Sequence, residues 1–149
     1  MGESIDRSMT EHERTEFLGS GGVGVIALAA DDQPYAVPVS FGFEPNGSHF
    51  YIRLASREDS ERSPLLNESR PARLVVYDGT NGHWTSVIAT GTLETVDANG
   101  IDTTVVEGLK HAQLPVFERL DGEPSVEFEL FVLEPETVVG RTTRPPQTD

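Results

Sequence analysis

The segment His83–Val96, HWTSVIATGTLETV, decides the fold. Apolar and polar side chains alternate along it, which is typical of a strand with one face in a core. Gly91 interrupts the alternation, and a glycine inside a strand indicates a bulge or a sharp bend. Bends of this kind let a small antiparallel sheet close into a barrel. The segment therefore predicts one long, bent strand of a barrel.

Five further segments have the length and residue types of strands. They are Val23–Ala30, Pro34–Phe43, Phe50–Ala55, Ala72–Tyr77 and Val126–Leu133. Turns rich in Asp, Asn and Gly, such as Pro45-Asn46-Gly47, separate most of them, and strands joined by tight turns pair antiparallel. The chain is thus predicted to be mostly β, an antiparallel six-stranded barrel with a few short helices.

Two or three short helices are expected beside the strands. Thr10 and Glu13 form a capping box that begins a helix of about ten residues, which glycines end at Gly19. A shorter helix is predicted over Arg62–Glu68, and apolar residues at helical spacing predict another over Ile101–Ala112. No linker or repeat divides the chain, so residues 1–149 are expected to form a single domain with flexible tails at 1–9 and 142–149.

The composition excludes several classes of partner. Asp and Glu number 25 against 11 Lys and Arg, and the net charge of −14 argues against binding to nucleic acid or anionic membranes. Without cysteine there is no disulfide framework and no thiolate metal site. No apolar run approaches the roughly 20 residues of a membrane-spanning helix, and the charged N-terminus lacks a secretory signal. A soluble, cytoplasmic protein is expected.

The charge balance also suggests an environment. Lys110 is the only lysine, and an acidic, lysine-poor chain is typical of a high-salt cytoplasm, where salt screens the repulsion among carboxylates. An ordinary acidic domain is the alternative. A halophilic protein is the prediction.

Two local features point to a ligand, each with a plain structural alternative. Pro38 interrupts the strand Pro34–Phe43, so this strand has an unpaired edge or bulge there, or faces a ligand. Arg53 lies on the next strand, and Ser60 and Arg62 follow in the loop. Guanidinium groups, hydroxyls and a helix start are suited to phosphate. The same arginines can equally pair with neighbouring carboxylates in a solvated loop.

Other chemistries have weaker support. The four histidines are scattered without metal-ligand spacing, so no metal site is expected. No G-x-S-x-G elbow is present, and the glycines at 19–24 lack the strand and helix that a phosphate-binding loop needs. Trp84 is either a core residue or, with Ser86 on the same strand face, part of a ligand surface.

In their order and spacing, four segments resemble the pyridoxamine 5′-phosphate oxidase-like flavoproteins, whose fold is the FMN-binding split β-barrel. They are GGVGVIAL (21–28), QPYAVPVSF (33–41), FYIRLASREDSER (50–62) and VVYDGTNGHWTSVIATGTLE (75–94). The resemblance runs from Glu11 to Arg141.

The resemblance implies a flavin site. Arg53, Ser60 and Arg62 would hold the FMN phosphate, with Arg62 where the family usually has lysine. The remaining residues of the implied cofactor site are Val37, Pro38, Val39, Ile52, Trp84 and Ser86. The resemblance also implies a homodimer with the flavin at the interface. The reaction would be that of an oxidoreductase with unknown substrate, since only Arg141 is a candidate for the family's substrate-binding arginine and histidine pair. The alternatives are an F420-dependent reductase and a flavin-binding or haem-binding protein without turnover.

Overall fold

A computed structural model describes residues 6–30, 32–44, 49–56, 69–80, 82–95 and 127–146. One helix and seven strands occur in these ranges. Their bounds are β1 Arg7–Ser8, α1 Glu11–Leu18, β2 Gly21–Ala30, β3 Gln33–Glu44, β4 His49–Ser56, β5 Arg70–Asp78, β6 Thr85–Thr95 and β7 Glu127–Thr142.

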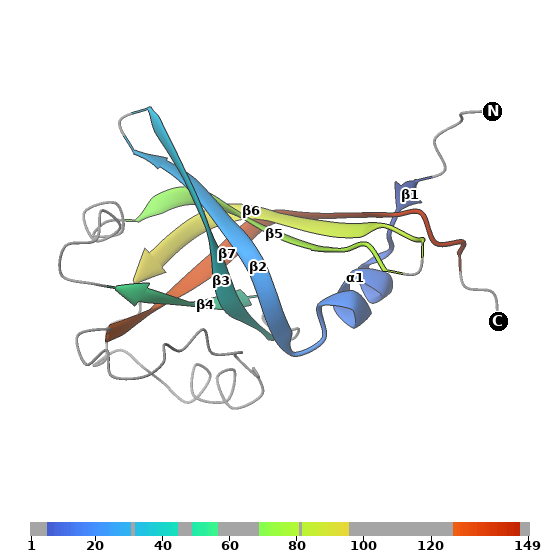
Figure 1. Cartoon of the computed structure of the whole chain (residues 1–149), viewed down its shortest axis with the longest axis horizontal. Coiled ribbons are helices and arrows are strands. Elements are labelled where there is room, and N and C mark those ends of the chain that lie inside the picture. Colours follow the sequence, from blue (N-terminus) through green and yellow to red (C-terminus); the bar gives the residue numbers. More distant parts are fainter. Residues whose placement is uncertain are drawn as a thin grey trace.

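The strands form a closed antiparallel barrel (Figure 1). Hydrogen bonding runs in the order β7-β4-β3-β2-β5-β6, and β6 returns to β7, so six strands close the ring. Every pairing is antiparallel. The predicted mostly β, six-stranded barrel is confirmed.

The inward-facing residues of these strands fill the barrel. Phe41, Phe50 and Phe131 are each only 1% exposed, and Ile26 and Leu74 are fully buried. Burying a side chain of this size contributes about 1.5–3 kcal/mol. The alternation in the sequence is therefore the alternation between core and outer surface.

The predicted irregularity at Gly91 is a β-bulge between β6 and β7. Thr90 lies opposite Thr137 and Gly91 lies opposite Pro135, so Glu136 is an extra residue on β7. A side chain at Gly91 would run into the carbonyl oxygen of Glu134. Glycine is required here because the two backbones approach too closely for a Cβ atom. The bulge also accommodates Pro135 within a long strand.

The capped helix is confirmed as α1. The Thr10 hydroxyl accepts from the Glu13 N–H at 3.1 Å, and the Glu13 carboxylate accepts from the Thr10 N–H at 2.9 Å. Leu18, 3% exposed, anchors the end of the helix in the core. Gly19 then ends it in the left-handed region, with φ of 57°.

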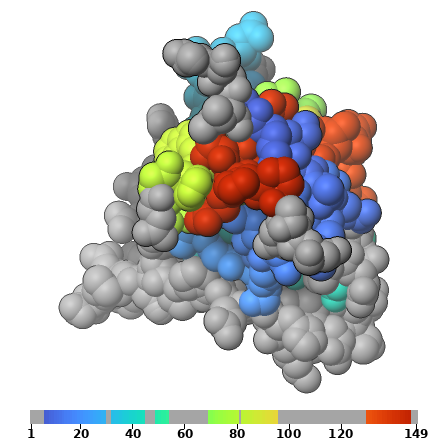
Figure 2. All heavy atoms as spheres, turned by 90° about the vertical axis from the view of Figure 1, so that its right-hand side faces the viewer, coloured from blue at the N-terminus to red at the C-terminus, as the bar shows by residue number. Residues whose placement is uncertain are grey.

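Residues 6–9 and 142–146 are the described parts of the two segments that were expected to be flexible tails, and they take part in hydrogen bonding. Arg7 and Ser8 pair with Thr142 and Arg141, and the Met9 N–H donates to the Gly140 carbonyl at 2.9 Å. The last strand, β7, extends to Thr142 instead of ending at Leu133. The reason is that the whole of β6, Thr85–Thr95, pairs with β7 between Phe131 and Thr142. Figure 2 shows the result, with N-terminal residues in blue beside C-terminal residues in red.

Several sequence predictions lie outside the described residues. These are the turn at 45–47 and the helices over 62–68 and 101–112. No helix in the described part of the chain is long and apolar enough to cross a membrane.

Candidate functional site

The candidate site begins where β3 and β4 separate. β2 pairs with β3 from Gln33 to Gly42, but β4 pairs with the other edge of β3 only from Ser40 onward. After Arg53, β4 continues in register with β7 alone within the described ranges. The two strands thus form a fork, with an edge of β3 at 33–39 that no described strand covers.

Pro38 lies on this unpaired edge. Its neighbour across the ladder is Val25 of β2, and its side chain is exposed on the outer face of the barrel. The structure therefore agrees with the edge-strand explanation of this proline, since a residue without an N–H disturbs no ladder there. An open edge also leaves backbone groups that can bind a ligand, so the two explanations are compatible.

Of the three residues predicted to bind the phosphate, only Arg53 lies within the described residues. It lies opposite Ser40 across the last paired position of the fork, and its side chain is partly buried on the outer face. Pro38 is two residues from Ser40 on β3, just beyond this last paired position. Ser60 and Arg62 lie outside the described residues. The structure thus brings Arg53 and Pro38 together at the fork.

Three other predicted site residues point into the barrel. Ile52 is fully buried and lies between Phe41 of β3 and Phe131 of β7. Val39 is 1% exposed, and Val37 packs against the same core. Their side chains support the strands, so any contact of Val37 or Val39 with a ligand is through backbone groups on the open edge.

Trp84 and Ser86 are at the far end of the same outer surface. Trp84 is 57% exposed, which excludes the core alternative. Its ring packs on Tyr77 at 5.9 Å between centroids and covers Gly79, where a side chain would collide with the indole. The backbone N–H of Trp84 donates to the Thr143 hydroxyl at 2.8 Å, and the Trp84 carbonyl accepts from the Thr143 N–H at 2.9 Å. The exposed indole is therefore held in place.

A row of apolar residues joins the two ends of this surface, and sequence reasoning missed it. In cross-strand register the row runs Pro38, Val25, Val75, Ile88, Val139. Val139 is 51% exposed, and Val23, close to the row on β2, is 48% exposed. The available signal was the unbroken apolar run of Val23–Ala30, where an ordinary barrel strand would alternate. A contiguous exposed apolar surface of this kind marks an interaction site.

Metal chemistry has no support in the described ranges, where no group of three or more His, Cys, Asp or Glu side chains is placed to hold an ion.

Comparison with known proteins places this geometry in context. The family model described as "Pyridoxamine 5′-phosphate oxidase" matches residues 10–142. An uncharacterized protein of Rhizobium meliloti (strain 1021) is 23% identical over 119 residues, covering 80% of this chain and 72% of that protein. The structure of an FAD-binding protein from Mycobacterium smegmatis has a TM-score of 0.66 at 18% identity, covering 94% of this chain and all of that one. An FAD-binding protein from Mesorhizobium loti has a TM-score of 0.63 at 21% identity, covering 93% and 99%. At these identities the two structures establish a shared fold.

Proposed function

Because the chain belongs to the pyridoxamine 5′-phosphate oxidase family, we propose that it is a flavoprotein that binds FMN and acts as an oxidoreductase on a small organic substrate. The observation that carries the proposal is the fork, where an unpaired strand edge lies beside a partly buried arginine. The FAD-binding proteins with the same fold add support for a flavin as the ligand class.

The residues at the fork fit a flavin nucleotide. The edge of β3 over 33–39 offers backbone carbonyls and N–H groups, and the pyrimidine edge of a flavin carries both donors and acceptors. Arg53 provides a cation suited to phosphate, because a guanidinium matches phosphate oxygens with two parallel hydrogen bonds. In the proposal Arg53 binds the phosphate together with Ser60 and Arg62, while Val37, Pro38 and Val39 orient the ring through the backbone.

When bound, the flavin supplies the electron transfer, and the protein supplies binding, orientation and exclusion of water. The apolar row between Pro38 and Val139 would exclude water from one side of the ring. Trp84 and Ser86 would contact the ring at its other end. No described side chain is assigned a proton transfer.

The distribution of these residues favours a homodimer. The strand order β3-β2-β5-β6 puts two strands between Pro38 and Ser86, so the strands that carry them are about 14 Å apart along the convex outer face. A flat ring system cannot follow a convex surface from the fork to Trp84 and Ser86. Two copies that pack their apolar rows together would instead bring the fork of one beside Trp84 of the other. We therefore propose two flavin sites between two protomers.

Spectroscopy of the purified protein tests the proposal. We expect flavin absorbance bands, and a loss of affinity for FMN of about tenfold or more in Arg53→Ala, since a charge-assisted phosphate contact is removed. Arg62→Ala is expected to behave in the same way. Arg73→Ala is the matched control, because Arg73 is an exposed arginine on β5 outside the proposed site. Colourless protein that takes up no added FMN would contradict the proposal.

Two further measurements settle the ligand and the reaction. Mass spectrometry of the released ligand distinguishes FMN from FAD, F420 and haem. Anaerobic reduction of the bound flavin by NADH or NADPH, followed by reoxidation with candidate acceptors, distinguishes an enzyme from a passive binder. Retention of flavin without any turnover would leave flavin binding in place and contradict the oxidoreductase assignment.

A further inference from the structure

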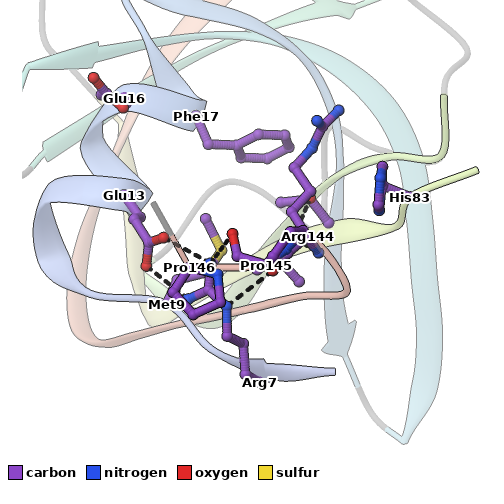
Figure 3. Close-up of a pocket in the computed structure, with 11 residues that line it drawn as sticks. Arg7, Met9, Glu13, Glu16, Phe17, His83, Arg144, Pro145 and Pro146 are labelled. Carbon is purple, nitrogen blue, oxygen red and sulfur yellow. Dashed lines mark hydrogen bonds and ion pairs between the residues drawn. The ribbon is translucent and has the colours of Figure 1, made fainter. Parts of the chain in front are cut away.

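A hollow lies on the other side of the segment that carries Trp84. It has a volume of about 740 Å³, which is within the range of ligand pockets. The N-terminal arm and α1 form one wall, and the segment after β7 forms another (Figure 3). His83 and Thr85 line it, while Trp84 and Ser86 lie on the outer face. This pocket is therefore distinct from the flavin surface proposed above.

Arg7 builds the pocket and has no donor left for a ligand. Its five N–H groups all have acceptors: the two carboxylate oxygens of Glu13 at 3.0 and 2.8 Å, and the carbonyls of Arg144, Ser8 and Pro145 at 2.9 to 3.3 Å. This arginine ties the N-terminal arm, the helix and the C-terminal segment together. Its charge is neutralised by Glu13.

Arg144 is placed to bind a ligand. Its backbone is fixed from both sides, because its carbonyl accepts from Arg7 and its N–H donates to the Thr142 hydroxyl at 3.1 Å. None of the hydrogen bonds within the described ranges uses its guanidinium group. In Figure 3 this side chain extends between Phe17 and His83, away from the Arg7–Glu13 pair. An available cation is therefore held at one side of the pocket.

Buried hydroxyl groups add a donor to the same pocket. Thr85 and Thr142, 5% and 3% exposed, hydrogen bond to each other at 2.8 Å and line the cavity. One hydroxyl proton is used in this bond. The other has no protein acceptor among the described residues, so it can donate to an oxygen of a ligand.

The remaining lining sets the ligand class. Met9, Phe17, Pro145 and Pro146 give the pocket an apolar part of its lining. Such a lining suits a compact hydrocarbon body. Glu16 lies beyond Phe17 on the side remote from Arg144, so a second negative charge on the ligand would be repelled (Figure 3). We propose that this pocket binds a small monocarboxylate with an aromatic or branched apolar body, its carboxylate on Arg144, His83 and the threonine pair.

Phenylacetate is the test ligand, with phenylacetamide as the uncharged analogue of the same shape. Binding is measured by calorimetry on the purified protein. The fluorescence of Trp84 gives a second readout, because this is the only tryptophan and its backbone is hydrogen bonded to Thr143, next to Arg144. We expect saturable binding of phenylacetate at concentrations up to about 10 mM, and affinity for phenylacetamide lower by about tenfold or more.

Two variants locate the binding. Arg144→Gln removes an exposed charge and is expected to lower the affinity for phenylacetate about tenfold. Arg73 is an exposed arginine outside the pocket, so Arg73→Gln is expected to leave this affinity unchanged. Thr85→Val keeps the shape of the side chain but removes the hydroxyl, and it is expected to lower the affinity for phenylacetate as well. Equal affinity for phenylacetamide, or binding that is unaffected by Arg144→Gln, would overturn the proposal. Binding that is lost in Arg53→Ala but retained in Arg144→Gln would also overturn it, since the ligand would then occupy the fork.

Discussion

At the scale of single residues, Gly91 has the most sharply defined role. A methyl group there would meet the Glu134 carbonyl oxygen and approach the Pro135 Cα to 2.7 Å. Neither is the end of a flexible side chain, so the β6–β7 ladder itself must shift. We expect Gly91→Ala to lower the free energy of unfolding by about 1–3 kcal/mol. Urea denaturation followed by circular dichroism measures the change.

Gly22→Ala is the matched control for this prediction. Gly22 is also a strand glycine, but its nearest neighbour to an added Cβ is a ring carbon of Phe41 at 3.8 Å, an ordinary contact. Its expected effect is within about 0.5 kcal/mol. Equal stability of the two variants would show that the bulge tolerates a side chain.

Single residues also mark what the sequence can and cannot predict about the site. The glycine at 91 and the proline at 38 break local rules, and such breaks are visible in a single sequence. The exposure of Trp84 and the inward direction of Ile52 depend on which strand face meets the core, and the barrel closure decides that. The roles of Arg7 and Arg144 were hidden because the contact between them joins residues 137 positions apart along the chain.

At the scale of elements, the stability of the contact between the N-terminal arm and α1 is expected to depend on pH. The hydrogen bonds from the Arg7 guanidinium, and then that from the Thr10 N–H, lower the pKa of Glu13 from 4.5 to about 2. A depressed pKa stabilises the folded state above the ordinary value, and this contribution is lost as the pH falls from about 4.5 to about 2. The attachment of the arm should therefore weaken in that window.

Glu13→Gln tests this prediction. We expect the variant to melt below the wild type at pH 6, with a difference in melting temperature that shrinks as the pH approaches about 2. A carboxyl titration of Glu13 by NMR measures the pKa directly. Glu94→Gln is the control, because Glu94 is exposed at the end of β6. Its melting temperature should stay within about 1 °C of the wild type at pH 6. An ordinary pKa for Glu13 would contradict the prediction.

Local signals predicted the elements where each strand or helix carries its own pattern. The capping box located α1, and alternation located the barrel strands. The pairing of β1 with the end of β7 had no such signal, because a two-residue strand is too short for a period. Its formation depends on contacts between segments about 135 residues apart, such as the Arg141–Asp6 ion pair.

At the scale of the whole molecule, the apolar row predicts self-association. Val139 is 51% exposed at the end of that row, and a carboxylate there would be buried without a partner in a dimer. We expect Val139→Asp to shift the protein from dimer to monomer in analytical ultracentrifugation. Ala29→Asp, an exposed position on β2 away from the row, should leave the mass unchanged. A wild type that is monomeric throughout would contradict the proposed dimer.

The net charge of −14 predicts that salt stabilises the protein. Eleven basic residues cannot neutralise 25 carboxylates, so excess negative charge repels itself across the folded surface. The Debye length falls from about 10 Å at 0.1 M salt to about 3 Å at 1 M, which removes repulsion between all but neighbouring charges. We expect the melting temperature to rise between these concentrations of KCl.

The same repulsion acts between two copies, so the proposed dimer should also strengthen with salt, and Val139→Asp should remain monomeric at both concentrations. Sucrose at matched osmolality separates screening from general exclusion of solutes from the protein surface, because it carries no charge. If KCl raises the melting temperature no more than sucrose does, screening is not the cause. A melting temperature that does not change between low and molar KCl would contradict the halophilic prediction, since the excess carboxylates would then cost the fold nothing that salt can relieve.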